Sequence, residues 1–212
     1  MKKYHKDLDI FIDSLQDSGN KITSEIRYKI HNDSDWEKGI LVVESCGLFD
    51  IPELIGDFTH LKEINFTQNK ITKLPESIGA LKSLKTLYLG INNLKSLPDT
   101  FGGLSELTEL YLFFNSLTTL PDTIGTLKSI KILEAYGNNL KSIPETIGQL
   151  KKLKRLDLSG NHLISIPNSI KHLTKLEYLD LESNSLSGNL SRVYNSRIGV
   201  EFFFDTLIGS TK

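Results

Sequence analysis

Cysteine is nearly absent from this chain, and its scarcity limits both the fold and the location. The 212 residues include one cysteine, Cys46, so no disulfide can form within the chain. Secreted repeat proteins that are capped by disulfides carry several cysteines, so we expect a reducing, cytoplasmic setting. Hydrophobic runs are only a few residues long, far below the stretch of about 20 that a membrane-spanning helix needs. Asp7, Asp9 and Asp13 also interrupt what would be the apolar core of a signal peptide.

The chain also lacks an excess of charge of either sign, since its formal net charge is -1. Proteins that bind nucleic acids or membrane surfaces usually carry a basic excess, so we expect neither as a partner. The five histidines are scattered without metal-ligand spacing. Phosphate-binding loops, dinucleotide fingerprints and nucleophile elbows are absent from the sequence. We therefore predict no cofactor, no metal and no catalytic activity.

Proline is scarce too, but its placement is regular. The six prolines stand 23 residues apart, from Pro52 to Pro167. A set of asparagines keeps the same step: Asn69, Asn92, Asn115, Asn138, Asn161 and Asn184. A fixed period with two residue types in phase indicates an internal repeat. Successive rows share the template LxxLxLxxNxLxxLPxxIGxLxx, as in the row that begins at Leu84.

This template resembles that of leucine-rich repeat proteins, in particular the 23-residue type of bacterial and intracellular Ras-related members. The resemblance implies an α/β solenoid, a right-handed arc with a parallel sheet on its concave side. Short 3₁₀ or irregular turns would form the convex side, and caps would cover both ends. The resemblance also implies that the concave face recognises a protein.

The residue types in the template predict the same architecture. An LxL segment has the period of a strand with one buried face. The asparagine that follows can both donate and accept hydrogen bonds, so stacked copies would form a ladder that satisfies backbone groups of its own and adjacent coils. Proline suits the first position of a helical turn, and the glycine inside that turn favours short 3₁₀ pieces. Because each coil buries its leucines only against its neighbours, the end coils need caps.

Residues 1–39 lie outside the repeat, and we expect them to cap its first coil. The apolar residues from Leu8 to Leu15 have helical spacing. The next segment is ambiguous, because Ile26 and Ile30 fit a helix while Ile26, Tyr28 and Ile30 also alternate like a strand. The N-terminal cap is thus a helix followed by either a helix or a strand.

The repeat domain is predicted to span residues 40–212, and residues 190–212 would form a degenerate closing coil. In that coil Val193 takes the turn position of the template, and Phe202 and Phe204 take the strand positions. The exposed side of this final coil would be the C-terminal cap.

Apolar side chains gather at strand positions that the core does not need to fill. We call this set the aromatic cluster: Tyr88, Ile91, Tyr111, Phe113, Phe114, Ile132 and Tyr136. An exposed apolar patch usually marks a binding site, and tyrosine is enriched in interface hot spots. Charged residues complete the predicted partner-binding set: Glu109, Glu134, Arg155, Asp157 and Asp180. We therefore expect a partner that presents an apolar side chain flanked by basic residues.

Two interpretations of this set remain open. Aromatic neighbours on parallel strands can simply support their own sheet, contributing about 0.5–1.5 kcal/mol per pair. The adjacent like charges of Asp157 and Asp180 favour binding instead, because they weaken the sheet. We predict a monomeric, non-catalytic module that binds a protein or peptide on its concave face. Alternatives are the substrate-recognition part of a larger enzyme or receptor, such as a leucine-rich repeat ubiquitin ligase, and a secreted or surface bacterial host-interaction protein.

Overall fold

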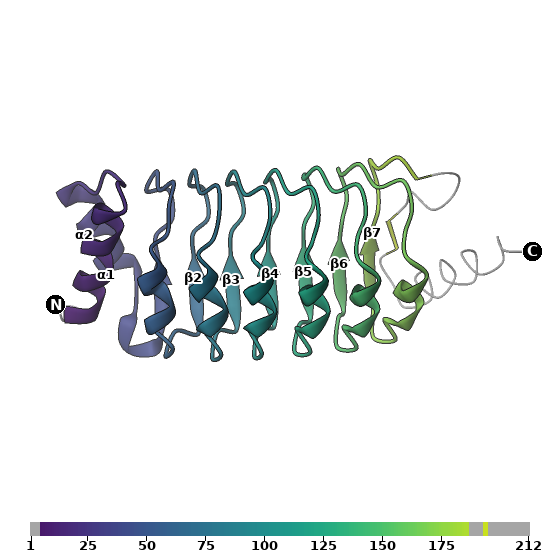
Figure 1. Cartoon of the computed structure of the whole chain (residues 1–212), viewed down its shortest axis with the longest axis horizontal. Coiled ribbons are helices and arrows are strands. Elements are labelled where there is room, and N and C mark those ends of the chain that lie inside the picture. Colours follow the sequence, from purple (N-terminus) through teal and green to yellow (C-terminus); the bar gives the residue numbers. More distant parts are fainter. Residues whose placement is uncertain (1–4, 187–192, 195–212) are drawn as a thin grey trace, which may run out of the picture.

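The chain winds into successive coils, and each coil contributes one short strand and one short 3₁₀ turn. The computed structural model describes residues 5–186 and 193–194. Two helices come first, α1 (Lys6–Asp17) and α2 (Ser24–Asp33). The strands are β1 (Ile40–Val42), β2 (Glu63–Asn65), β3 (Thr86–Tyr88), β4 (Glu109–Tyr111), β5 (Ile132–Glu134), β6 (Arg155–Asp157), β7 (Tyr178–Asp180) and β8 (Val193–Tyr194). In Figure 1 the helices lie at one end of the row of strands, and the 3₁₀ turns form a second row.

Strands β1 to β7 form one parallel sheet in sequence order. The register advances by one repeat at each step, so Leu87 of β3 pairs with Leu110 of β4. In both strands the central residue is buried and the two flanking residues are half-buried. Leu87 and Leu89 are fully buried, as expected for an LxL strand with one face in the core. These features confirm the predicted solenoid with a parallel concave sheet.

Short 3₁₀ turns form the opposite side of the coils. They are η2 (Glu53–Asp57), η3 (Glu76–Ala80), η4 (Asp99–Gly103), η5 (Asp122–Thr126), η6 (Glu145–Gln149) and η7 (Asn168–His172). A proline precedes each turn at the N-cap, one position earlier than the template suggested, and Pro98 is extended there with φ -68° and ψ 153°. The glycine inside the turn is needed for stacking, because a β-carbon on Gly79 would collide with the backbone carbonyl of Thr100.

The repeated asparagines lie between coils and bond to two of them, and all but Asn184 are buried. In the Asn115 coil, the side-chain Nδ2 donates to the carbonyl of Leu89 (2.9 Å) and to that of Leu112 (3.0 Å). Its Oδ1 accepts a hydrogen bond from the backbone N–H of Leu94 (2.9 Å). The same pattern occurs at Asn69, Asn92, Asn138, Asn161 and Asn184. Each amide thus satisfies backbone groups that the tight bend leaves without a sheet partner.

The N-terminal helices cover the first coil. The ambiguous segment is helical: Thr23 caps α2 by accepting from the N–H of Ile26, and the strand alternative is wrong. On α1 the Phe11 ring meets the Phe58 ring edge-on, with centroids 5.8 Å apart. One hydrophobic cluster runs from α1 through the described coils. A separate N-terminal domain ending at residue 39 therefore stays a prediction.

The predicted closing coil differs from the structure at Val193. The repeat frame put Val193 in a 3₁₀ turn, but it lies in β8, which pairs antiparallel with β7. An antiparallel strand can cover the last parallel edge without continuing the repeat. Phe202 and Phe204 lie outside the described residues. Within residues 5–186 and 193–194, every helix is too short or too polar to span a lipid bilayer.

Candidate functional site

The predicted binding residues lie on strands β3 to β7 or in the bend that follows each strand. Tyr88, Tyr111, Ile132 and Glu134 flank the central core leucines and are half-buried. Ile91 and the remaining aromatic residues follow the strands, where the chain turns inward. Because the strands are parallel and in register, equivalent positions form rows across the face, with neighbours about 4.8 Å apart. The aromatic cluster is therefore contiguous across β3, β4 and β5.

Two tyrosines form the first stack of the cluster. The rings of Tyr88 and Tyr111 are nearly parallel, 7° apart, with centroids 4.8 Å from each other. The Tyr111 hydroxyl donates a hydrogen bond to the Glu109 carboxylate (3.0 Å). Burial and this hydrogen bond raise the pKa of the Tyr111 hydroxyl well above its ordinary value. Tyr111 is thus fixed as a neutral donor, and Glu109 is held beside it.

Three further rings form the second part of the cluster. Phe113 and Tyr136 stack with centroids 5.1 Å apart and planes 8° from parallel. Phe114 meets Tyr136 edge-on at 5.2 Å, with an angle of 81°. Room for these rings comes from glycines: Phe113 lies over Gly90, and a β-carbon on Gly137 would come within 2.6 Å of the Phe114 ring. The phenylalanine rings of the cluster thus pack over two glycines, Gly90 and Gly137, that have no side chain to displace them.

A row of left-handed residues runs along the bend after the strands. Its members are Ser45, Gln68, Ile91, Phe114, Gly137, Gly160 and Ser183, with φ between 50° and 64°. Glycine is the default residue in this conformation, and any other residue there costs about 1–2 kcal/mol of folding free energy. Ile91 is β-branched, which makes its φ of 56° a genuine outlier. Yet Ile91 and Phe114 are 44% and 56% exposed, so only part of each residue is buried within the chain in return for this cost.

Arg155 organises the charged part of the face. Its Nε donates to the Glu134 carboxylate (2.7 Å), and its Nη2 lies 3.6 Å from the Asp157 carboxylate. The guanidinium also lies over the Tyr178 ring, 3.8 Å from its centroid, a favourable cation–π geometry. The structure therefore brings Glu134, Arg155 and Asp157 together as an internally paired group.

Asp157 and Asp180 also bond to their own backbone, a role that the sequence reasoning missed. Asp157 accepts from the N–H of Ser159 (3.1 Å), and Asp180 accepts from the N–H of Glu182 (2.9 Å). Asn65 does the same one repeat before the cluster, accepting from Thr67 N–H (2.8 Å). An Asp or Asn that recurs at one template position and bonds two residues ahead is the signal that would have revealed this role. The adjacent charges are thus less of an argument for binding than we expected.

Burial also affects the ionisation of Asp157. Its side chain is only 8% exposed. Burial raises the pKa of the Asp157 carboxyl, and Asp180 raises it further, although two hydrogen bonds from Ser159 oppose the change. Arg155 also lowers the pKa of Asp157, and its effect is the smallest of these. The acidic end of the face therefore carries its most accessible negative charge at Asp180 and the exposed Glu182.

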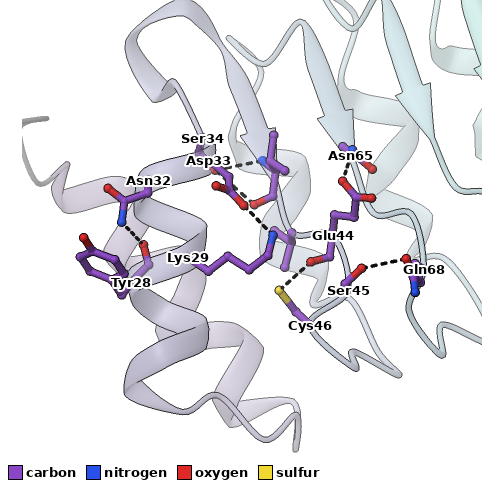
Figure 2. A network of polar contacts seen from close by, with 12 residues as sticks. Tyr28, Lys29, Asn32, Asp33, Ser34, Glu44, Ser45, Cys46, Asn65 and Gln68 are labelled. Carbon is purple, nitrogen blue, oxygen red and sulfur yellow. Dashed lines mark hydrogen bonds and ion pairs between the residues drawn. The ribbon is translucent and has the colours of Figure 1, made fainter.

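The N-terminal end of the same face is polar and bonded internally. Figure 2 shows Asn65 donating to the Glu44 carboxylate (3.2 Å) and Ser45 donating to Gln68 (3.0 Å). The Cys46 thiol, close by, donates to the carbonyl of Glu44 (3.2 Å). Burial raises the pKa of this thiol, which makes it a poorer nucleophile. The polar side chains at this end of the face bond to one another or to nearby backbone, in contrast to the exposed rings of the aromatic cluster.

In the described part of the chain, no group of three or more His, Cys, Asp or Glu side chains is arranged to hold a metal ion. The face offers hydrogen-bond partners, aromatic edges and carboxylates. These groups are suited to recognition by contact and charge.

Comparison with known proteins agrees with this geometry. A family model described as a leucine-rich repeat region matches residues 40–138 and 111–193. The chain belongs to the leucine-rich repeat family. A search of curated proteins gives no match. Solved leucine-rich repeat structures are similar to the chain, and they include proteins from bacteria and plants.

Three solved structures illustrate the similarity. A leucine-rich repeat protein of Leptospira interrogans is 37% identical, with TM-score 0.53, over 65% of this chain and 41% of that one. The ectodomain of the Arabidopsis thaliana receptor kinase GASSHO1/SCHENGEN3, in complex with CASPARIAN STRIP INTEGRITY FACTOR 2, is 36% identical, with TM-score 0.61, over 65% and 17%. YopM from Yersinia enterocolitica is 27% identical, with TM-score 0.68, over 88% and 39%. The leucine-rich repeat chain thus spans less than half the length of each of these proteins.

Proposed function

We propose that this leucine-rich repeat chain is a non-catalytic, monomeric, cytoplasmic module that binds a protein or peptide on its concave face through the aromatic cluster. The observation that carries the proposal is the pair Ile91 and Phe114. Both keep large apolar side chains in a left-handed conformation, and both leave about half of the side chain exposed. Strained residues persist where function requires them, and contact with a partner would bury the apolar surface that these two residues leave exposed.

The rest of the cluster supports the same proposal. The stacked tyrosines and phenylalanines present rigid, amphipathic rings that lose little entropy on binding, which is typical of interface hot spots. The Arabidopsis relative was solved with a bound factor, which supports a protein or peptide as the class of partner.

The proposal is tested by comparing what three immobilised proteins capture from extracts of the source organism. The baits are the wild type, the double variant Ile91→Gly/Phe114→Gly, and the control Gln68→Gly. Gln68 has the same left-handed conformation, with φ 59°, but lies outside the cluster. We expect quantitative mass spectrometry to find the same enriched protein with the wild type and the control, and to find it lost with the double variant. Equal capture by all three baits would contradict the proposal.

We choose Ile91 and Phe114 because the other rings are less clean probes. Tyr111 and Phe113 are half-buried and stack on Tyr88 and Tyr136. Replacing them would remove internal stacking of about 0.5–1.5 kcal/mol per pair as well as any partner contact. The exposed pair separates binding from stability.

A further inference from the structure

We propose that the partner is an extended polypeptide segment with one apolar and one basic side chain, two positions apart. The apolar side chain packs against Phe114 and Tyr136, and the basic side chain pairs with Asp180 and Glu182. This proposal rests on the proposed function and specifies its partner. It follows from where the aromatic cluster ends and from which of its neighbouring charges are already paired.

The aromatic cluster ends in a step on its C-terminal side. Phe114 is its most exposed ring, at 56%, and it lies over Gly137. The next residue in that row is Gly160, where an added β-carbon would meet nothing closer than the backbone nitrogen of Gly137 at 3.5 Å. The Phe114 ring thus covers Gly137 and leaves the backbone of Gly160, one coil further along, uncovered. An apolar side chain of a partner can lie on this backbone and contact the ring at the same time.

In the described part of the chain, the face beyond that step carries carboxylates that have no cationic partner, although Asp180 accepts a hydrogen bond from the Tyr178 hydroxyl (3.2 Å). Arg155 already pairs with Glu134 at 2.7 Å and approaches Asp157 at 3.6 Å. Within residues 5–186 and 193–194, no lysine or arginine forms an ion pair with Asp180 or Glu182. The Glu182 carbonyl accepts from the Gly160 N–H at 2.9 Å, so the backbone of Glu182 lies beside the uncovered backbone of Gly160. A basic group of the partner is therefore complementary to this side of the cluster.

The opposite side of the cluster has lysines instead. A shallow hollow at the N-terminal end of the sheet is lined by three lysines and two glutamates: Glu37, Lys38, Lys62, Glu63 and Lys85, with Ile40 and Thr86. A cationic partner residue would be repelled there more than at Asp180 and Glu182. A basic partner residue is therefore more complementary to Asp180 and Glu182 than to this hollow.

The spacing follows from strand geometry. Adjacent coils are about 4.8 Å apart, and alternate residues of an extended segment point to the same side about 6.6 Å apart. Gly160 belongs to the β6 coil and Glu182 to the adjacent β7 coil, so the two contacts are one coil spacing apart. A lysine or arginine two positions from the apolar side chain is therefore close enough for its flexible side chain to reach Asp180 and Glu182.

The experiment selects a phage-displayed library of random linear peptides on the immobilised wild-type protein. We expect the enriched peptides to share an apolar–any–basic pattern. Dissociation constants of synthetic copies are then measured for the wild type and for Gly160→Ser. Serine occupies the same row with the same φ at Ser45 and Ser183, so this variant should fold while placing a side chain on the bare backbone. We expect it to weaken binding roughly tenfold or more.

Charge is tested with Glu182→Lys and the control Thr67→Lys, which occupies the same template position five repeats earlier. We expect the first to weaken binding about fivefold or more and the control to leave it unchanged. Three results would overturn the extended-segment proposal: enriched peptides that lack a basic residue, peptides that bind Gly160→Ser as tightly as the wild type, or no enrichment at all.

The double variant Ile91→Gly/Phe114→Gly separates the proposed function from this further inference. If it loses the peptides while Gly160→Ser keeps them, the proposed function stands and only this inference is wrong. If both keep them, both fail.

Discussion

The Phe113 ring lies in the space that a β-carbon on Gly90 would fill. Gly90 is buried, and its missing side chain lets Phe113 lean across one coil while it stacks on Tyr136 from the next. A glycine in one repeat thus sets the orientation of an aromatic ring in its neighbour. The surface that a partner would meet depends on this pair and not on either residue alone.

Replacing Gly90 with alanine should move the Phe113 ring without unfolding the protein. Overpacking usually costs about 1–3 kcal/mol, and we expect a loss near 1 kcal/mol because the half-buried ring can rotate outward. In a Phe113→Ala background the same change should cost almost nothing. Denaturant unfolding of the two single variants and the double variant measures this coupling. Additive losses would show that Gly90 does not position Phe113.

Replacing Asn115 with alanine should destabilise the solenoid from inside. The change leaves the N–H of Leu94 without its side-chain partner, while the carbonyl of Leu89 keeps only the hydrogen bond from Asn92. Each unsatisfied buried group costs about 1–3 kcal/mol. Asn184 is less buried than Asn115, so Asn184→Ala should cost less. Equal unfolding free energies for Asn115→Ala and the wild type, by chemical denaturation, would show that water replaces the amide.

The repeat predicted the fold in detail because its constraints are periodic. Leu87 and Leu89 had to face the core for the template to work, and both are fully buried. The second N-terminal helix was undecided because Ile26 and Ile30 satisfy two periods at once. A helix leaves Tyr28 exposed at 66% while Ile30 is buried, and the alternation of residues could not show this.

Less of the candidate site was predictable. The sequence predicted that Ile91 and Phe114 follow strands of the repeat, but their backbone conformation is disfavoured for such residues, so no propensity predicts it. Arg155 stood beside the acidic residues in the sequence, yet only side-chain geometry shows which carboxylates it pairs with. The antiparallel pairing of Val193 likewise follows from the open edge of β7 and not from the repeat.

Asp157→Asn should change the pH dependence of stability. Because burial raises the folded-state pKa of Asp157, the folded protein holds this proton to a higher pH than the unfolded chain. The unfolding free energy therefore falls as pH rises through that pKa. Asparagine can keep the bond to Ser159, as Asn65 does with Thr67. We expect the variant to lack this fall, and parallel curves of unfolding free energy against pH would contradict the assignment.

Tyr111→Phe should remove the tyrosine that ionises at the most alkaline pH. Burial and Glu109 raise the folded-state pKa of Tyr111, so its contribution to stability is present below the unfolded value of about 10 and is lost as pH rises above it. Tyrosinate absorbance during an alkaline titration measures this directly. The wild type should retain a late-ionising component that the variant lacks. Identical late components in both proteins would place the shift on another tyrosine.

The unfolding free energy of Ile91→Gly/Phe114→Gly, by denaturant titration beside the wild type, most directly tests whether the aromatic cluster serves a partner. Relief of the left-handed strain, about 1–2 kcal/mol per residue, should offset the partial burial that is lost. We predict a value within about 1 kcal/mol of the wild type, since neither exposed side chain is needed to hold the sheet. A loss of about 3 kcal/mol or more would show that the cluster supports its own sheet.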